Sequence, residues 1–447
     1  MSRFMERGFA RRTLLVGAAA AGAAATSAAT PGATAWAGTG EAVAGGWKGP
    51  AEQSAVAAET ARLERALIKL RRDIHRHPEA PGQEQRTAAV VARELRAAGL
   101  TVTTGVGGHG VVGVLRGSRP GRTVAYRADM DAVPPKDIVG TGPAPAHVCG
   151  HDVHTAVAIG VARVLARLRH RLSGTAVFLF QPAEETLSGA RALIDAGVLE
   201  RLGIEEIHAL HCGSFPVGRF AVTPGYGMPG QDKAEVTLSG PDASEAARRL
   251  AGDIGALATV ALPRSPADLE RLVADAQTPD GPLARFVAVR TSAEKARVSV
   301  SYRCWPQEQY VEVREDIRRA ARPYAGAGVR FPAEPFPAMV CPARDARLLA
   351  RHLRRTVGRG MVTELRAAFP PFSGEDFALY LNRIPGTYTF LGVRAPGAPI
   401  TTSYPHYPDF SPDERAIGVG VRAMAGWIAE RTRPAREQPG GSTPQDG

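Results

Sequence analysis

Four short segments rich in histidine, cysteine and acidic residues lie at the ends of predicted strands, and they constrain the fold of this chain most strongly. They read RADMDA (127–132), HVCGHD (147–152), QPAEE (181–185) and IHALH (207–211). Helical and strand-like runs alternate around them, which is typical of an α/β fold with a largely parallel sheet. Because functional residues of such sheets gather at the carboxyl ends of the strands, we expect these segments to meet.

The sequence pattern changes near residue 232 and returns near residue 340. Between these points we expect the order β-α-β-β-α-β, which predicts a small α+β domain inserted into the larger α/β domain. The predicted organisation is an export signal at 1–37, a linker at 38–57, an α/β domain at 58–231 and 340–433, an inserted lid at 232–339 and a disordered tail at 434–447.

The N-terminal residues have the layout of an export signal. Arg11 and Arg12 precede an apolar, alanine-rich run, and small residues follow around Ala33 and Ala35. Paired arginines at this place indicate the twin-arginine route. A membrane anchor is the alternative, but the run is short and weakly apolar. We therefore expect a secreted or cell-envelope protein with no stable membrane insertion after the signal is cleaved.

Charge and cysteine content narrow the functional class further. The net charge is +11, but the arginines alternate with acidic residues and form no basic run with interleaved aromatics. We therefore expect no nucleic-acid partner. The four cysteines form no CxxC pair. Cys149 lies among histidines, which is a setting for a metal ligand, whereas the other three are expected to be small buried residues.

The residue types in the four segments suit two divalent cations, which need several nitrogen, oxygen or sulfur ligands. Taken singly, a strand histidine is usually a core residue and a glutamate pair is usually solvated. Only the occurrence of ligand residues in all four segments together indicates a metal site. Cys149 and His151 can turn toward one site. Adjacent Glu184 and Glu185 point different ways, so one can bind metal while the other faces a water molecule. Such a carboxylate can take a proton from water and pass it to a leaving nitrogen.

Several motifs together resemble one family. They are RADMDA, HVCGHDVHTA, QPAEE, LHCGSFPVG, FSGEDFALYLNRIPG and HYPDFSPDE. The chain resembles, over about residues 60–430, the dinuclear-metal amidohydrolases and metallopeptidases that include hippurate hydrolases, N-acyl-amino-acid amidohydrolases and indole-acetyl-amino-acid hydrolases. The resemblance implies a metal-binding catalytic α/β domain with an inserted lid that also serves for dimerisation. It implies a small N-acyl amino acid or peptide-like substrate.

The resemblance also implies roles for individual residues. Glu184 matches the general acid/base, and Asp131 matches the aspartate that orients a metal ligand from behind. Asp152 and His154 lie inside the motif without being assigned as ligands, and His75 is expected to be structural. The cofactors would be two divalent ions, zinc or manganese, with cobalt and nickel as alternatives. The residues that match metal ligands are Cys149, His151, Glu185, His211 and His406.

The predicted lid departs from the family pattern. A Gly-Gly-His stretch whose histidine reaches the active site is replaced by residues 238–244, and an expected asparagine is missing from 291–296. Losing that histidine as a hydrogen-bond donor to the oxyanion of the reaction typically lowers turnover by ~10²–10³-fold. One hypothesis is a hydrolase with another donor, such as Arg290 or Arg303. The rival is a metal-retaining, non-catalytic binding protein for acyl-amino-acid-like ligands. The complete ligand set favours the hydrolase, and a dipeptidase or carboxypeptidase would use the same chemistry.

Overall fold

The computed structural model describes residues 49–324 and 326–434. The predicted export signal, the first part of the predicted linker and nearly all of the predicted tail lie outside the described residues. Within the described ranges, no helix combines the length and the hydrophobicity that crossing a bilayer requires.

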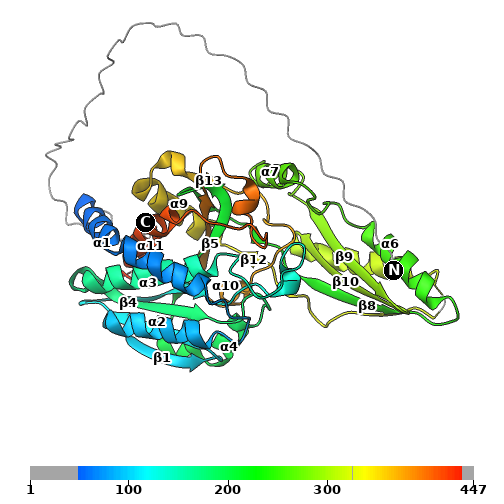
Figure 1. Cartoon of the computed structure of the whole chain (residues 1–447), viewed down its shortest axis with the longest axis horizontal. Coiled ribbons are helices and arrows are strands. Elements are labelled where there is room, and N and C mark those ends of the chain that lie inside the picture. Colours follow the sequence, from blue (N-terminus) through cyan, green and yellow to red (C-terminus); the bar gives the residue numbers. More distant parts are fainter. Residues whose placement is uncertain (1–48, 325, 435–447) are drawn as a thin grey trace, which may run out of the picture. The chain divides into compact units, whose positions relative to one another are not determined.

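The larger domain is built on an eight-stranded sheet (Figure 1). In spatial order its strands are β1 (Thr101–Val106), β2 (Gly110–Arg116), β4 (Ser173–Gln181), β3 (Arg119–Asp129), β5 (Glu206–Pro216), β14 (Gly386–Arg394), β6 (Phe220–Val222) and β13 (Val362–Glu364). The four central strands, β4, β3, β5 and β14, are parallel, while β1, β2 and β6 pair antiparallel toward the edges. The predicted α/β class with a largely parallel sheet is confirmed.

Helices cover both faces of this sheet because both faces are apolar. Along β4, Phe178 packs in one buried cluster and its neighbours Val177 and Leu179 pack in another, as expected from the alternation of side chains in a strand. The first cluster includes residues of α1 (Pro50–His75), α2 (Gln85–Ala97), α3 (His151–Arg167), α9 (Ala343–Thr356) and α11 (Arg415–Arg431). The second includes residues of α4 (Gly189–Asp195), α5 (Val198–Leu202) and α10 (Ala378–Leu381).

The start of α1 corrects the predicted linker. The helix begins at Pro50, so residues 50–57 are helical. Proline suits the first position of a helix, where its missing N–H is not needed. Val56, only 2% exposed, packs into the core and extends the helix before the leucine pattern begins.

The inserted domain contains an antiparallel sheet with two helices on one face. The strand order is β11 (Gly328–Arg330), β8 (Asp232–Thr237), β10 (Arg297–Trp305) and β9 (Phe286–Glu294). Helices α6 (Ala243–Gly255) and α8 (Tyr310–Ala321) pack on it. The predicted order β-α-β-β-α-β is therefore present. Strands β7 (Gly227–Met228) and β12 (Met339–Val340) pair where the chain enters and leaves this domain.

One helix inside the predicted lid was not expected. α7 (Pro266–Asp275) begins after the N-cap Ser265, and its buried Leu269 and Leu272 join the apolar cluster of the larger domain. The lid segment 232–339 thus contributes one helix to the catalytic core. Single-turn helices lie at Pro135–Asp137 (η1), Arg169–Arg171 (η2), Gln307–Gln309 (η3), Arg359–Met361 (η4) and Ile400–Thr402 (η5).

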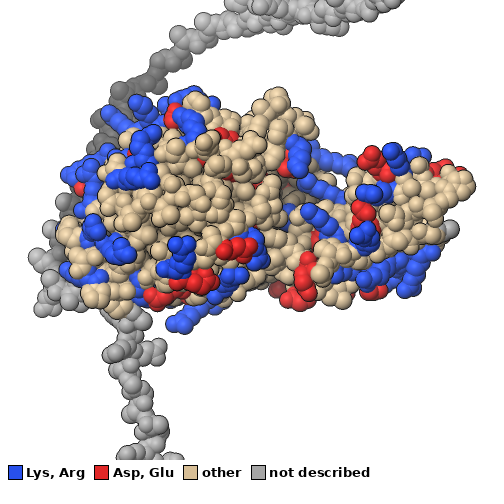
Figure 2. Space-filling view, turned by 90° about the horizontal axis from the view of Figure 1, so that it is seen from below, with Lys and Arg blue, Asp and Glu red and all other residues tan. Residues whose placement is uncertain are grey.

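Charged side chains are mixed over the surface in view. On the face in Figure 2, lysine and arginine side chains are scattered with acidic side chains between them. The absence of a nucleic-acid partner stays a prediction.

Candidate metal centre

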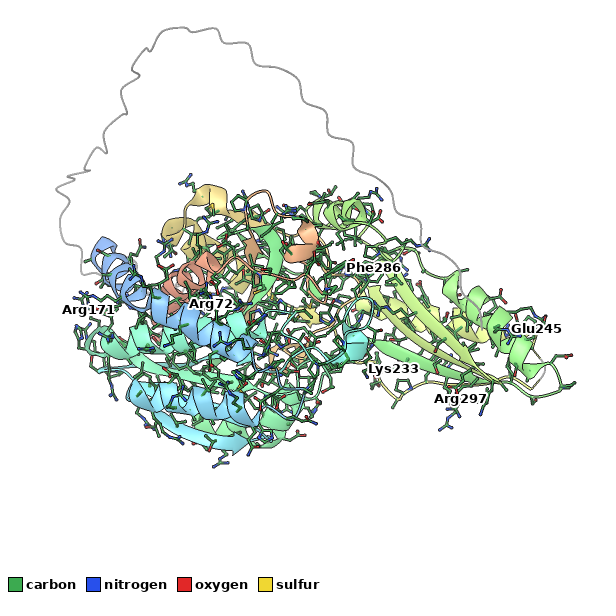
Figure 3. All side chains as sticks on the ribbon, in the orientation of Figure 1. Arg72, Arg171, Lys233, Glu245, Phe286 and Arg297 are labelled. Atoms are coloured by element: carbon green, nitrogen blue, oxygen red, sulfur yellow. The ribbon has the colours of Figure 1, made fainter. Side chains whose placement is uncertain are left out.

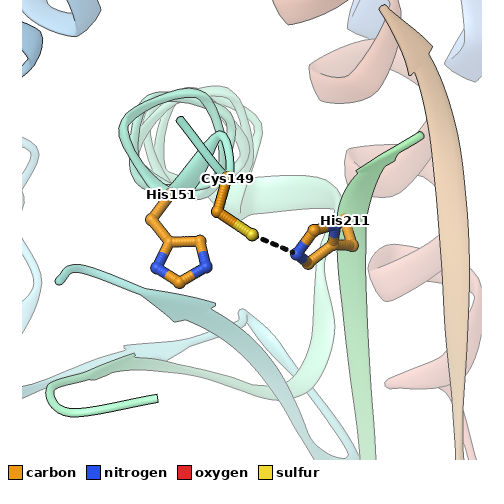
Figure 4. Close-up of side chains that lie close together, drawn as sticks. All are labelled: Cys149, His151 and His211. Atoms are coloured by element: carbon orange, nitrogen blue, oxygen red, sulfur yellow. Dashed lines mark hydrogen bonds between the residues drawn. The ribbon is translucent and has the colours of Figure 1, made fainter. Parts of the chain in front are cut away.

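All five residues that match metal ligands lie close together. Three overlapping groups have ligand atoms within 4.8 Å of one another. The groups are Cys149–His151–His211, Cys149–Glu185–His406 and His151–Glu184–Glu185. Because they share residues, they form one centre, part of which Figure 4 shows. The four predicted segments and the late HYPDF motif therefore meet in space.

The backbone around the centre differs from the prediction at two places. His211 lies inside β5 rather than at its end, because β5 stays paired with β14 as far as Pro216. The HVCGHD segment does not follow a strand, because β3 ends at Asp129 and His151 is the first residue of α3. The turn before it requires Gly150, which has φ of +97° and whose Cβ would lie 2.6 Å from Cys212 Sγ. Cys149 and His151 are thus held on a tight turn that leads from a loop into α3.

His406 is placed by a loop after η5. Its N–H donates to Val148 O at 2.7 Å, which ties the loop to the segment that carries Cys149. Its φ of +69° is uncommon for a residue other than glycine. Such backbone conformations are found at functional sites.

The histidine rings have the orientation that metal ligands need. Nδ1 of His151, His211 and His406 lies 2.9, 2.7 and 3.0 Å from the main-chain oxygens of Asp131, Cys212 and Asp137, respectively. An Nδ1–H that donates to a carbonyl leaves the Nε2 lone pair directed away from it, toward the centre. Nε2 of His151 and Oε1 of Glu185 are buried and have no hydrogen-bond partner among the described residues. Buried acceptors are normally satisfied, so a cation fits here.

The charges of the centre also suit cations. Burial, followed by the carboxylates of Glu185 and Glu184, raises the pKa of Cys149 well above its usual range. Burial, followed by Glu375 and Glu185, does the same to the pKa of Glu184. The acidic groups of the pocket therefore cannot all be ionised at once. Divalent cations would relieve the repulsion between their negative charges.

Two residues of the HVCGHDVHT segment have other tasks. His154 accepts from Cys212 N–H at 2.8 Å through Nε2, and its Nδ1 lies 2.6 Å from Asp129 Oδ1. Both ring nitrogens are engaged, so His154 has none left for a metal. Asp152 binds Arg71 and His75 at 2.6 and 2.9 Å. The structure thus places these side chains in supporting contacts.

Asp131 lies behind two of the ligand-bearing segments. Its Oδ2 accepts the Glu185 N–H at 2.9 Å, and its Oδ1 lies 3.3 Å from His151 Nδ1. This is the position that the predicted orienting role requires.

Glu184 lies in the centre beside the expected ligands. It is 5% exposed, and its Oε2 lies 3.9 Å from His151 Nε2. Its carboxylate is also within 4.8 Å of ligand atoms of Glu375 and Asp376. This separates Glu184 from Glu185, which faces His406 at 3.3 Å.

A buried arginine network behind Glu184 was not assigned from the sequence. Nη2 of Arg127 lies 3.0 Å from both Glu375 Oε1 and Asp376 Oδ1, and Nη1 lies 2.5 Å from Asp129 Oδ2. These residues belong to the quoted RADMDA and FSGEDF motifs. Both motifs were therefore identified in the sequence, but they did not reveal that Arg127 pairs with an acidic residue about 250 positions away.

The centre opens into a cavity of about 700 Å³ that is lined by residues of both the α/β domain and the inserted lid. Cys149, Glu184, Glu185, His211 and His406 line it, together with lid residues that include Lys233, Arg290 and Arg303. Residues 238–244, where a Gly-Gly-His stretch was expected, are not among the described residues that line it. Both arginines named as replacement donors do lie at the cavity.

All four cysteines are buried free thiols, and Cys212, Cys304 and Cys341 are buried as expected.

Comparisons with known proteins agree with this geometry. Residues 125–430 match the family described as peptidase family M20/M25/M40. N-acetylcysteine deacetylase of Bacillus subtilis is 31% identical over 80% of this chain and 95% of its own. IAA-amino acid hydrolase ILR1-like 5 of Arabidopsis thaliana is 28% identical over 80% of this chain and 85% of its own. The crystal structure of Bacillus subtilis YXEP, described as a dinuclear metal-binding M20 peptidase, matches with a TM-score of 0.63 and 28% identity, covering 83% of this chain and 99% of that chain.

Proposed function

The chain belongs to peptidase family M20/M25/M40 and is a metal-dependent amidohydrolase, and we propose that its substrates are N-acyl amino acids or small peptide-like amides. The observation that carries this proposal is the set of unpartnered ligand atoms beside a separate buried carboxylate, Glu184. The cavity above them is large enough for a small acylated amino acid.

The residues of the centre would hold two divalent metal ions. Cys149, His151 and His211 form one ligand group, and Cys149, Glu185 and His406 form the other, so Cys149 is common to both. When bound, such ions polarise a carbonyl and make water more acidic. We propose zinc or manganese, since thiolate, imidazole and carboxylate together suit either, with cobalt and nickel as alternatives.

The chain's own residues move the proton. Glu184 takes a proton from the attacking water at its carboxylate and then delivers it to the departing amine nitrogen. Arg127 balances the charges of Glu375 and Asp376, which lie next to Glu184. Asp131 keeps His151 and Glu185 in place.

We also propose export and dimerisation. The paired Arg11 and Arg12 before an apolar run support secretion or delivery to the cell envelope by the twin-arginine route. The resemblance of the whole chain to a family whose lid serves for dimerisation supports a homodimer formed through the lid.

The test of the function is hydrolysis of a panel of N-acetyl amino acids and dipeptides by metal-loaded protein. We expect turnover of N-acetyl amino acids that Glu184→Gln abolishes while the metal content stays unchanged. Metal retention without turnover of any substrate would instead favour the non-catalytic binding protein.

A further inference from the structure

One face of the lid sheet carries three cations toward the cavity. Side chains alternate along a strand, and Val236 of β8 and Val300 of β10 pack into the buried lid cluster with α6 and α8. Lys233, Arg290 and Arg303 therefore lie on the opposite face, which has no lid helix. All three line the cavity above the metal centre. Figure 3 labels Lys233 and, farther along the same sheet, Arg297.

The strand register groups these cations around a small residue. Ser301 on β10 is the cross-strand partner of Arg290 on β9 and also of Lys233 on β8. Since neighbouring strands lie about 4.8 Å apart, the Cα atoms of Lys233 and Arg290 are about 10 Å apart, with the serine between them. Arg303 follows Ser301 by two residues and faces the same way. Ser301, whose Oγ accepts a hydrogen bond from Gln231 Nε2 at 3.0 Å, thus lies among three positive groups.

No ion pair with an acidic residue neutralises these cations, although the charge of Glu184 acts on Arg303. Within residues 49–324 and 326–434, Lys233, Arg290 and Arg303 form no side-chain ion pair or hydrogen bond. The next cation on the same face, Arg297, does have a partner, because its Nη1 lies 3.3 Å from Glu235. The sheet face thus neutralises its outer arginine and leaves unpaired the three cations that border the cavity.

Arg303 is the most confined of the three. Its Nη1 is buried without a partner, and it lies so close to Gly374 that a Cβ there would come within 2.3 Å. Burial and the like charge of Arg290 outweigh the opposite charge of Glu184 and lower the pKa of Arg303 to about 10. A buried guanidinium without an anion is costly, so an anionic ligand would remove a cost that the free protein bears.

We propose that Lys233, Arg290 and Arg303 form a subsite for two carboxylates, so that the preferred substrates are N-acyl derivatives of aspartate or glutamate. This inference rests on the proposed function. One arginine can hold the α-carboxylate of an ordinary substrate in a bidentate pair, which leaves two cations without an anion. The side-chain carboxylate of an acidic amino acid lies only a few bonds away and fills the remaining place. An acyl group that ends in a carboxylate has the same charge and is the alternative source.

The test compares substrates that differ only in this charge. We would measure kcat/KM for N-acetyl-L-glutamate and N-acetyl-L-glutamine, which have nearly the same shape, and for N-succinyl-L-glutamine. Wild-type protein is expected to favour N-acetyl-glutamate over N-acetyl-glutamine by about 10- to 100-fold, the range typical of a charge-assisted contact. Arg290→Gln should remove most of this preference. Arg290 is exposed and unpaired, so its loss should leave folding unchanged.

Arg297→Gln is the matched control, because Arg297 lies on the same sheet face and is already paired with Glu235. It should keep the preference. If N-succinyl-glutamine is favoured over N-acetyl-glutamine instead, and Arg290→Gln abolishes that, the two-carboxylate subsite stands with its second anion on the acyl side. Equal or better turnover of the neutral N-acetyl-glutamine would overturn the inference while leaving the hydrolase function intact.

If no substrate is turned over, a binding measurement still tests the subsite separately from the hydrolase function. Calorimetry on metal-loaded Glu184→Gln protein should then show N-acetyl-glutamate binding about 10- to 100-fold more tightly than N-acetyl-glutamine. That result would keep the subsite while the proposed function fails. Equal affinities would reject the subsite as well.

Discussion

Replacing Asp131 with alanine should weaken metal binding without unfolding the domain. The change removes the 2.9 Å bond from the Glu185 N–H and the 3.3 Å contact to His151 Nδ1. His151 keeps its 2.9 Å contact with the main-chain oxygen of residue 131, so its ring stays in place. The lost contact at Glu185 is charge-assisted, and such contacts contribute about 1.5–3 kcal/mol. We therefore expect metal affinity to fall about 10–100-fold, as for other supporting contacts of metal ligands.

The assay is competition between the protein and a chromophoric chelator at fixed pH. Asp137→Ala is the control, because Asp137 orients His406 only through its main-chain oxygen, which the substitution leaves in place. Its metal affinity should stay within about threefold of wild type, well below the effect of losing a supporting contact. Equal affinities for Asp131→Ala and wild type would refute the reasoning that the carboxylate positions the ligands.

Three further predictions concern the ligand set and the core. Cys149→Ser should lower metal affinity by more than the ~100-fold typical of a lost supporting contact, since a serine hydroxyl stays protonated; metal analysis after gel filtration checks this. Glu206→Gln should lower Tm by about 4–6 °C, because it leaves Arg431 and Arg122 without their buried partner. Its neighbours hold the pKa of Glu206 well below its usual range, so this stabilisation exists at neutral pH and is lost as pH falls; the Tm difference should shrink below about pH 4. Removing metal with a chelator should lower Tm by about 5 °C, and an unchanged Tm would argue against tightly bound ions.

The sequence predicted the order of helices and strands better than their lengths. The alternation of apolar runs predicted the α/β domain and the inserted β-α-β-β-α-β unit. It missed that β5 continues past His211 to Pro216, because that extension depends on pairing with β14, far along the chain. It also failed to predict α7, because the few apolar residues of this helix are buried only through its packing on the catalytic core.

The candidate site was predictable where its residues are contiguous. The motifs predicted Cys149, His151, Glu184 and Glu185 as site residues because rare residue types lie side by side in them. The supporting network was not predictable, since Arg127 meets Glu375 across the fold.

The lid cations show the same limit. Arg290 was named as a possible donor, but its grouping with Lys233 follows from strand register around Ser301, which a single sequence does not reveal.

The central claim is that two metal ions act together in one hydrolytic site. Its most direct test is to titrate metal-free protein with zinc or manganese while following hydrolysis of an N-acetyl amino acid. The account predicts that activity rises until two equivalents per chain are bound and that Glu184→Gln binds the same two equivalents without turnover. Full activity at one equivalent, or activity without metal, would contradict it.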